Sequence, residues 1–255
     1  DFSFVSQDSS SYLRDLGHND GLEQLIDAVE KIDGVKTARI LYLYPSTTTL
    51  NLIDKIADSK VFVNYFDMPL QHISQNMLKI MKRGKGAEKL IELMNYMRSK
   101  PNSFVRTTFI AGHPGESEED FEELCSFVEE FGFDRGNVFS YSDEEGTSAE
   151  TRDDKIEQEL IDERAEILGD IISQTTIKSL ENDIGKSFEV YIDGESEEHE
   201  YLLSARKTIW APQIDGEIYI NDNEGNLPIV FGEIYEVEAT QLAGDKLLAK
   251  IIRKV

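Results

Sequence analysis

The sequence contains one cysteine, Cys125, among 255 residues, and it contains no long apolar run. A single thiol cannot form an intramolecular disulfide, and it cannot by itself supply the several thiolates of an iron–sulfur site. The apolar runs fall short of the roughly 20 residues that cross a bilayer, and no basic segment followed by an apolar core marks a signal peptide. We therefore expect a cytoplasmic protein with no disulfide framework and no membrane span.

Basic residues are also scarce, since 26 Lys and Arg stand against 50 Asp and Glu and give a formal net charge of −24. Phosphate binding needs clustered Lys and Arg, so this balance argues against a broad nucleic-acid surface. Hydrophobic residues make up 40% and charged residues 30%, which is the composition of an ordinary globular protein. The length suits one large domain, or a medium domain followed by a small one.

Strand-like and helix-like segments alternate through the first 140 residues. Near-continuous apolar runs predict five strands covered on both faces, and apolar residues at helical spacing predict the helices between them. Such alternation implies an α/β fold with right-handed crossovers and a parallel sheet; an open or closed (β/α) barrel and a doubly wound sheet both fit. The predicted strands are 2–6, 38–44, 61–66, 104–111 and 137–141, and the predicted helices are 22–32, 49–57, 74–82, 87–98 and 117–131.

The pattern changes after residue 150. Apolar residues at helical spacing predict one long helix over 153–183, which Gly185 ends. Beyond it, short alternating runs separated by turn residues predict a small antiparallel β-barrel. The runs are 188–192, 201–203, 217–220, 234–239 and 246–252, and the turns are Asp193-Gly194, Asp215-Gly216 and Glu224-Gly225. The predicted domains are therefore 1–150 and 186–255, joined by a helical linker over 151–185.

In parallel α/β folds, ligands bind at the C-terminal ends of the strands. The turn Gly112-His113-Pro114-Gly115 lies at such an end, and a helix capped by Ser117 follows it. Glycine there would let a ligand approach the backbone, and the helix N-terminus would offer free N–H groups; a plain strand-to-helix turn would look the same. Gln71 and His72 follow another strand and could hydrogen-bond a polar ligand, although a lone histidine is more often structural.

Three other features have simpler interpretations. The acidic run 116–123 suits the N-terminal end of a helix and a solvated face. Cys125 lies among apolar residues of the same helix and is interpreted as a buried structural thiol rather than a nucleophile. The only basic cluster is interpreted mostly as a solvated helix end, with a substrate contact as the alternative; its members are Lys79, Lys82, Arg83, Lys85 and Lys89.

Several segments resemble the radical S-adenosylmethionine (SAM) methylthiotransferases. They are SQDSSSY, ILYLYPS, YFDMPLQHISQNMLKIMKRG, VRTTFIAGHPGESEEDF and VFSYSDEEGTSA, and together they cover nearly all of residues 1–150. Residues 186–255 resemble the TRAM domain, a small β-barrel that ends these enzymes. Within it, ARKTIWAPQIDGEIYI is similar to the branch of the family that modifies a ribosomal protein.

The resemblance implies a partial (β/α) barrel of the TIM type followed by an OB-like TRAM barrel. It also implies SAM and, in the full-length protein, two 4Fe–4S clusters as cofactors. Family members carry three cysteines in an N-terminal domain and a CxxxCxxC loop after the first barrel strand, and neither is in this sequence. We therefore expect a fragment whose abrupt start cuts into a longer protein, which holds no metal by itself and is inactive alone.

Site residues follow from the same resemblance by position. Gly112 and the turn after it match the cofactor-binding strand end, and residues 139–141 are expected beside the adenine. His113 stands where the family more often has an aromatic or apolar residue, so we assign it no role, and we assign no catalytic residue. The predicted SAM-binding residues are Gln7, Ser46, Gln71, Arg106, Gly112 and Tyr141.

The chemistry that the resemblance implies is a radical reaction. A reduced cluster binds the amine and carboxylate of SAM and cleaves it, and the resulting deoxyadenosyl radical takes a hydrogen atom from an unactivated C–H bond. A methylthio group is then delivered to the substrate. The protein excludes water and holds the sulfonium beside the cluster. A reductant protein is an implied partner.

Two branches of the family differ in substrate: one modifies an adenosine of tRNA, the other an aspartate of small-subunit ribosomal protein S-twelve. Residues 186–255 hold 7 Lys and Arg and 14 Asp and Glu, a net charge of −7, which would repel RNA and attract a basic protein. We therefore predict the ribosomal protein as substrate, docked on Glu195, Glu197, Glu198 and Glu200.

Simpler or different interpretations remain open. The four glutamates would otherwise only solvate a hairpin tip. A tRNA substrate contacted by Lys79 to Lys89 is one alternative function, and a non-enzymatic binding module on a degenerate barrel is another.

Overall fold

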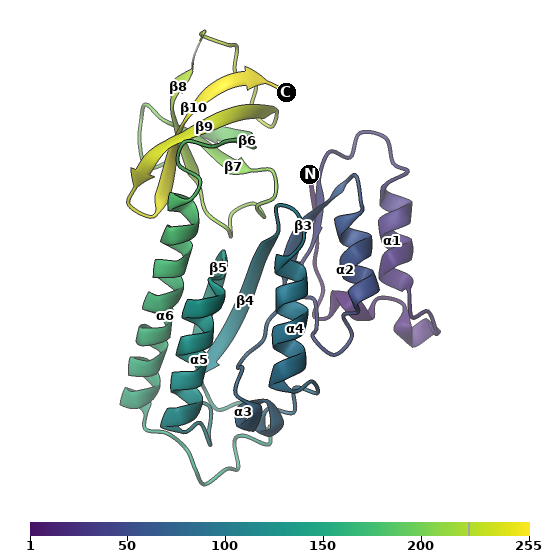
Figure 1. The fold of residues 1–255 in the computed structure, drawn as a ribbon, viewed down its shortest axis with the longest axis vertical. Coiled ribbons are helices and arrows are strands. Elements are labelled where there is room, and N and C mark those ends of the chain that lie inside the picture. Colours follow the sequence, from purple (N-terminus) through teal and green to yellow (C-terminus); the bar gives the residue numbers. More distant parts are fainter. Residues whose placement is uncertain (224) are drawn as a thin grey trace. The chain divides into compact units, whose positions relative to one another are not determined.

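The structure is a computed structural model that describes residues 1–223 and 225–255. It divides into two compact units, residues 1–175 and 176–255, whose elements are labelled in Figure 1. Within the described residues, none of the helices combines the length and the apolar composition that a membrane span requires.

The first unit is built on a parallel sheet. Its strands are β1 (Phe2–Phe4), β2 (Ala38–Ile40), β3 (Phe62–Asp67), β4 (Phe104–Ala111) and β5 (Arg135–Ser140). They lie in chain order, and each neighbouring pair is parallel. A doubly wound sheet reverses its strand order at a switch point, and this sheet does not. The predicted parallel sheet is therefore confirmed, and of the two architectures it is a half-barrel.

Helices connect the strands and cover one face of the sheet. Val105 and Phe109 of β4 lie in the apolar core with Leu90 of the fourth helix and Leu124 of the fifth. Because successive side chains of a strand alternate, Arg106 and Ile110 lie on the opposite, inner face of the half-barrel. The helices are α1 (Gly21–Val29), α2 (Leu50–Ala57), α3 (Gln75–Ile80), α4 (Ala87–Arg98), α5 (Glu118–Phe131) and α6 (Gln158–Glu181), with 3₁₀ turns η1 (Ser9–Ser11) and η2 (Arg14–Leu16).

Several elements are shorter than the sequence predicted, and two of the differences have clear causes. The strand predicted over 38–44 ends at Ile40, because Tyr42 adopts a left-handed conformation (φ 58°) and donates its N–H to the Asp67 carboxylate at 3.0 Å. The helix predicted from 153 begins at Gln158, because the Asp154 carbonyl accepts the Gly115 N–H at 3.1 Å and keeps that segment out of the helix. The strand predicted over 2–6 ends at Phe4, and the helix predicted over 22–32 ends at Val29.

The N-termini of α3 and α5 are joined through one carboxylate. Ser117 and Asp120 form a capping box at the start of α5, as the sequence predicted for Ser117. Asp120 also accepts hydrogen bonds from Ser74, the N-cap of α3, and from Asn76 at 2.8 Å. Burial acts to raise the pKa of Asp120, but the hydrogen bonds from Ser74, Asn76 and Ser117 outweigh it and lower the pKa to about 2.

The second unit is a closed barrel of strands β6 (Ser187–Glu195), β7 (Leu203–Lys207), β8 (Ile218–Asn223), β9 (Ile234–Ala243) and β10 (Lys246–Lys254). Neighbouring strands follow the order β10-β8-β7-β6-β9, and the interior is filled by apolar side chains such as Val190, Ile218, Val237 and Leu247. This confirms the predicted small barrel.

Three details of the barrel differ from the prediction. The pairing of β10 with β8 is parallel rather than antiparallel, because strand direction cannot alternate around a closed ring that has an odd number of strands. The predicted turn at Asp193-Gly194 lies inside β6, where the register against β7 shifts between Ile192 and Gly194. The run predicted over 201–203 reaches β7 only at its last residue, Leu203. Glu224 of the predicted turn Glu224-Gly225 lies outside the described residues.

Asp120→Asn is expected to remove a pH-dependent contribution to stability. The folded-state pKa of Asp120 lies below its ordinary value of 3.8, so the contribution is present above pH 4 and is lost as the pH falls toward 2. The shift corresponds to about 2 kcal/mol of unfolding free energy at pH 6. Urea unfolding followed by circular dichroism at pH 6 and pH 2.5 measures it.

The matched control is Glu119→Gln, which removes an exposed carboxylate from the same helical turn. We expect the control to behave as wild type at both pH values within about 0.5 kcal/mol. A difference between wild type and Asp120→Asn that is equally large at pH 6 and pH 2.5 would contradict the assignment.

Candidate functional site

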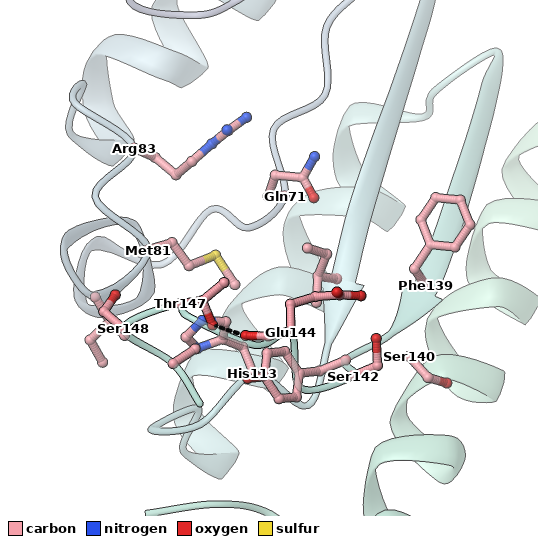
Figure 2. A pocket seen from close by; sticks show the side chains of 14 residues that line it. Gln71, Met81, Arg83, His113, Phe139, Ser140, Ser142, Glu144, Thr147 and Ser148 are labelled. Atoms are coloured by element: carbon pink, nitrogen blue, oxygen red, sulfur yellow. Dashed lines mark hydrogen bonds between the residues drawn. The ribbon is translucent and has the colours of Figure 1, made fainter. Parts of the chain in front are cut away.

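A cavity of about 500 Å³ opens at the C-terminal ends of β4 and β5 (Figure 2). Small-molecule sites in proteins occupy about 300–1,000 Å³, so the size suits a nucleoside-sized ligand. It lies where ligands of parallel α/β folds bind. Its lining residues are Gln71, Ile80, Met81, Arg83, Ile110, His113, Phe139, Ser140, Tyr141, Ser142, Glu144, Thr147, Ser148 and Ala149.

Two of the predicted site residues, Gln71 and Tyr141, line this cavity. Gln71 adopts a left-handed conformation (φ 70°). Its N–H donates to the Thr108 carbonyl at 2.8 Å, and its carbonyl accepts the Ile110 N–H at 2.9 Å. The backbone of Gln71 is thus fixed to β4, and its amide lies at the cavity in Figure 2. Tyr141 is fixed in the same way, since its N–H donates to the Ala111 carbonyl at 2.9 Å.

Aromatic rings form one side of the cavity. Phe139 and Tyr141 lie two positions apart at the end of β5, so their side chains lie on the same face, and 59% of Phe139 is exposed. The Tyr141 ring meets His113 edge-on, with ring centres 5.0 Å apart. Burial and the hydrogen bond to Asp143 raise the pKa of Tyr141 to about 12, so its hydroxyl stays protonated. Burial lowers the pKa of His113, which keeps its ring neutral at pH 7.

Gly112 lies behind the cavity rather than in its lining. Its φ is 79°, and a Cβ atom at this position would lie 2.6 Å from Cγ1 of Ile161 in α6. Its N–H donates to the Glu116 carboxylate, at 3.1 Å to Oε2. The positive φ and the close approach of Ile161 in α6 therefore require glycine at this position.

Glu116 is a buried anchor, whereas the sequence placed it in a solvated acidic run. Its side chain is fully buried, its Oε1 accepts from Arg164 Nη1 at 2.8 Å, and its Oε2 lies 3.5 Å from His72 Nε2. Nδ1 of His72 accepts the Ser74 N–H at 3.0 Å, which places the hydrogen of the neutral ring on Nε2, facing Glu116. The structural interpretation of His72 agrees with this geometry. Arg164 was missed, although its spacing from Ile161 and Leu168 places it on the buried face of α6.

Arg106 lies on the inner face of the half-barrel, below the cavity. Ile110 is four residues further along the same strand, about 13 Å away. Nη1 of Arg106 lies 3.3 Å from Oδ1 of Asp67, a residue with no exposed surface. Burial raises the pKa of Asp67, and the charge of Arg106 opposes this. Arg106 is therefore not among the residues that line the described cavity.

Comparison with known proteins supports the division into two units. Residues 8–128 match the radical SAM superfamily, and residues 184–252 match the TRAM domain. The chain thus contains a radical SAM domain followed by a TRAM domain. It is 78% identical to "Ribosomal protein uS12 methylthiotransferase RimO" of Aliarcobacter butzleri, over 99% of this chain and 57% of the relative. Identity to the proteins of the same name from Sulfurovum sp. and Campylobacter jejuni (strain RM1221) is 60% and 54%, each over 100% of this chain and 57% and 58% of the relative. The chain thus spans somewhat more than half the length of these curated relatives.

The remaining predicted residues of the radical SAM domain lie away from the cavity. Gln7 and Ser46 are exposed, in the loops after β1 and β2. Asp8 joins those loops, because its carboxylate accepts from the Ser10 hydroxyl at 2.7 Å and from the Thr47 hydroxyl at 3.3 Å. Neither Gln7 nor Ser46 lines the described cavity.

The predicted docking residues of the TRAM domain separate into two kinds. Glu195 ends β6, and Glu195, Glu197 and Glu200 are exposed. Glu198 is held in place, since it bonds Lys246 at 2.7 Å and also accepts from the hydroxyl of Tyr219. The Lys246 hydrogen bond lowers the pKa of Glu198. Glu198 is exposed as well, but Lys246 offsets its charge, so the negative charge of this surface comes mainly from the other three glutamates.

The cavity fits SAM, whereas this chain does not fit an iron–sulfur cluster. Phe139 and Tyr141 supply aromatic side chains to its lining, and the Gln71 amide and the hydroxyls of Ser140 and Ser142 offer polar contacts. Cys125 is the one thiol of the sequence, and burial within α5 raises its pKa to about 11. Among the described residues, no three His, Cys, Asp or Glu side chains are grouped so as to hold a metal ion.

Arg164→Met is expected to destabilise the radical SAM domain, because it leaves the Glu116 carboxylate buried without its cation. Breaking a buried pair in this way costs about 3–5 kcal/mol. The double variant Glu116→Gln with Arg164→Met removes both charges and is expected to recover more than half of that loss. Urea unfolding of wild type, Glu116→Gln, Arg164→Met and the double variant, followed by circular dichroism at pH 7, gives the four free energies of the cycle.

Lys55→Met is the control, since it breaks an exposed pair with Asp27 in the same unit. We expect it to change stability by less than about 1 kcal/mol. If the losses in the two single variants simply add in the double variant, Glu116 and Arg164 are not coupled and the anchor assignment is wrong.

Proposed function

We propose that this chain supplies the SAM-binding half-barrel and the TRAM domain of a methylthiotransferase that modifies an aspartate of uS12, the small-subunit protein S-twelve. The observation that carries this proposal is the 78% identity to the RimO protein of Aliarcobacter butzleri, which extends over 99% of this chain and therefore over both domains. We place the activity in the cytoplasm, with a reductant protein as a further partner.

The proposal gives the cavity residues defined tasks. SAM, when bound, is the source of the radical that removes a hydrogen atom from the substrate. Phe139 and Tyr141 would flank its adenine, and the Gln71 amide would hydrogen-bond a polar group of the ligand. The backbone of Gln71 is bonded to β4 and Phe139 belongs to β5, so these side chains extend from fixed backbone positions that would orient the ligand.

The TRAM domain provides the docking surface in this proposal. Glu195, Glu197 and Glu200 are exposed, and the domain carries a net charge of −7 over residues 186–255. A basic ribosomal protein is attracted to such a surface, and RNA is repelled.

The basic cluster gives little support to a tRNA substrate. Arg83 donates to the Pro69 carbonyl at 2.6 Å and Lys85 to the Thr48 carbonyl at 3.3 Å. Both side chains thus contact the segments that follow β3 and β2 and are partly buried, rather than being spread over an exposed basic surface.

Mass spectrometry tests the function directly. The complete gene product that contains these residues is reconstituted with its clusters, SAM, sulfide and a reductant, and is offered uS12 and tRNA together. We expect the methylthio mass increment on an aspartate of uS12. An increment on tRNA instead, or on neither substrate, would refute the proposed substrate.

Replacing Glu195, Glu197 and Glu200 together by Gln is expected to weaken uS12 binding by about three- to tenfold at low salt, and to flatten its salt dependence, because the surface that attracts the basic partner is lost. Surface plasmon resonance at several salt concentrations measures both effects.

The matched control replaces Glu123, Glu129 and Glu130, which are exposed on α5. It changes the net charge by the same amount at another surface. Equal effects of the two triple variants would show that only total charge matters and would contradict a docking surface on the TRAM domain.

A further inference from the structure

One cation lines the cavity, and it comes from the basic cluster. Arg83, in the loop between α3 and α4, is the only Lys or Arg among the described lining residues. Figure 2 shows its guanidinium extending from that loop toward Gln71. The neighbouring Lys82 is exposed and does not line the cavity.

The backbone at the end of α3 explains why Arg83 lines the cavity and Lys82 does not. Lys82 (φ 55°) and Gly84 (φ 69°) are both left-handed, and Arg83 between them donates its N–H to the Leu78 carbonyl at 2.8 Å. A Cβ atom at Gly84 would lie 2.4 Å from the Ser46 hydroxyl, so the turn is packed against the loop after β2. The reversal of chain direction sends the Arg83 side chain inward.

The guanidinium is held on two sides. Its Nη2 donates to the Pro69 carbonyl at 2.6 Å, and its carbon lies 4.9 Å from the centre of the Tyr44 ring. Pro69 and Tyr44 belong to the segments that follow β3 and β2. Both supports restrict the orientation of the side chain without neutralising its charge.

No carboxylate of the described residues pairs with Arg83, and its Nε–H is buried without a hydrogen-bond partner. Three other arginines of the same unit, which are fully or mostly buried, each have a carboxylate partner. Arg39 pairs with Asp1, Arg106 with Asp67 and Arg164 with Glu116. A half-buried cation without an anion is costly, and a fixed guanidinium fork suits a carboxylate. The missing partner is therefore a carboxylate that a ligand brings.

We propose that Arg83 is the carboxylate receptor of this cavity. The proposal rests on the proposed function, which supplies two carboxylates: the methionyl carboxylate of SAM and the aspartate side chain of uS12. The chemistry at Arg83 is the same for both, a charge-assisted hydrogen bond from the fork to two oxygens.

Calorimetry without reductant distinguishes the two sources, because SAM then binds and is not cleaved. The complete gene product with its clusters is titrated with SAM and with decarboxylated SAM, as wild type, Arg83→Gln and Arg83→Lys. If Arg83 receives the SAM carboxylate, Arg83→Gln weakens SAM binding at least about tenfold and leaves binding of decarboxylated SAM unchanged. Arg83→Lys restores part of the loss. Lys79→Gln, an exposed cation on α3, is the control and binds as wild type.

If Arg83 instead receives the substrate carboxylate, SAM affinity is unchanged in Arg83→Gln. The kcat/KM for uS12 then falls at least about tenfold, mainly through KM, and Arg83→Lys is intermediate. Either result supports the proposal and identifies the source.

The proposal is overturned in two ways that differ from each other. Equal weakening of SAM and decarboxylated SAM in Arg83→Gln, or no change above twofold in any of these quantities, shows that Arg83 only supports the loop. If the wild-type protein neither binds SAM nor modifies uS12, the proposed function itself fails, and that result does not depend on any Arg83 variant.

Discussion

The buried carboxylate of Glu116 is the interaction on which the site depends. It is reached by an N–H from the end of β4, by the guanidinium of Arg164 on α6 and by the ring of His72 in the segment after β3. A carboxylate without exposed surface is stable only with such partners. Once they are in place, the positions of the turn after β4, the start of α5 and the packed part of α6 are fixed together. The cavity lies directly in front of that turn, so its shape follows from a group that does not line it.

The inner face of the half-barrel is arranged in layers by the two-residue period of its strands. At one level Tyr65 and Phe104 stack with ring centres 5.2 Å apart. Two residues further along, Asp67 pairs with Arg106, and beyond them Ile110 reaches the cavity. Adjacent strands are in register here, with Tyr65 opposite Phe104 and Asp67 opposite Arg106. The aromatic pair and the charged pair therefore lie in separate layers. Along the strands, the charged pair lies between the aromatic pair and the cavity.

Local patterns predicted local structure well. The strand over Phe104–Ala111, the helix over Ala87–Arg98 and the Ser117 cap agree with the sequence-based expectation, because each depends on residues within a few positions of one another. Gln71 and Tyr141 both line the cavity, since the carboxyl ends of parallel strands meet at one edge. Their role in SAM binding stays a prediction. Predictions failed where a contact between residues far apart in the chain determines the structure. Glu116 belongs to an acidic run by sequence, and only Arg164, 48 residues away in the chain, makes it a buried anchor.

Position 112 is a similar case, because a glycine at the end of a strand was expected to let a ligand approach the backbone. The structure fills that space with Ile161 of α6, a contact that no local pattern contains. Arg83 and Lys82 show the converse case. They are adjacent and equally basic, yet a left-handed turn directs only Arg83 into the cavity. Composition cannot distinguish such neighbours, because the direction of the backbone determines which of the two side chains lines the cavity.

The distribution of charge acts at long range, through the net charge of the chain, and at short range, through single groups inside the cavity. A net charge of −24 creates a field that attracts cations, and both proposed ligands are cationic overall: SAM carries a sulfonium and an ammonium against one carboxylate, and a ribosomal protein is basic. That field guides approach, but it is screened beyond about 8–10 Å at physiological ionic strength and opposes any carboxylate that must enter the cavity. The fixed guanidinium of Arg83 offsets this repulsion inside an otherwise acidic protein. Long-range attraction then favours the approach of the cationic molecule, and Arg83 binds its carboxylate inside the cavity.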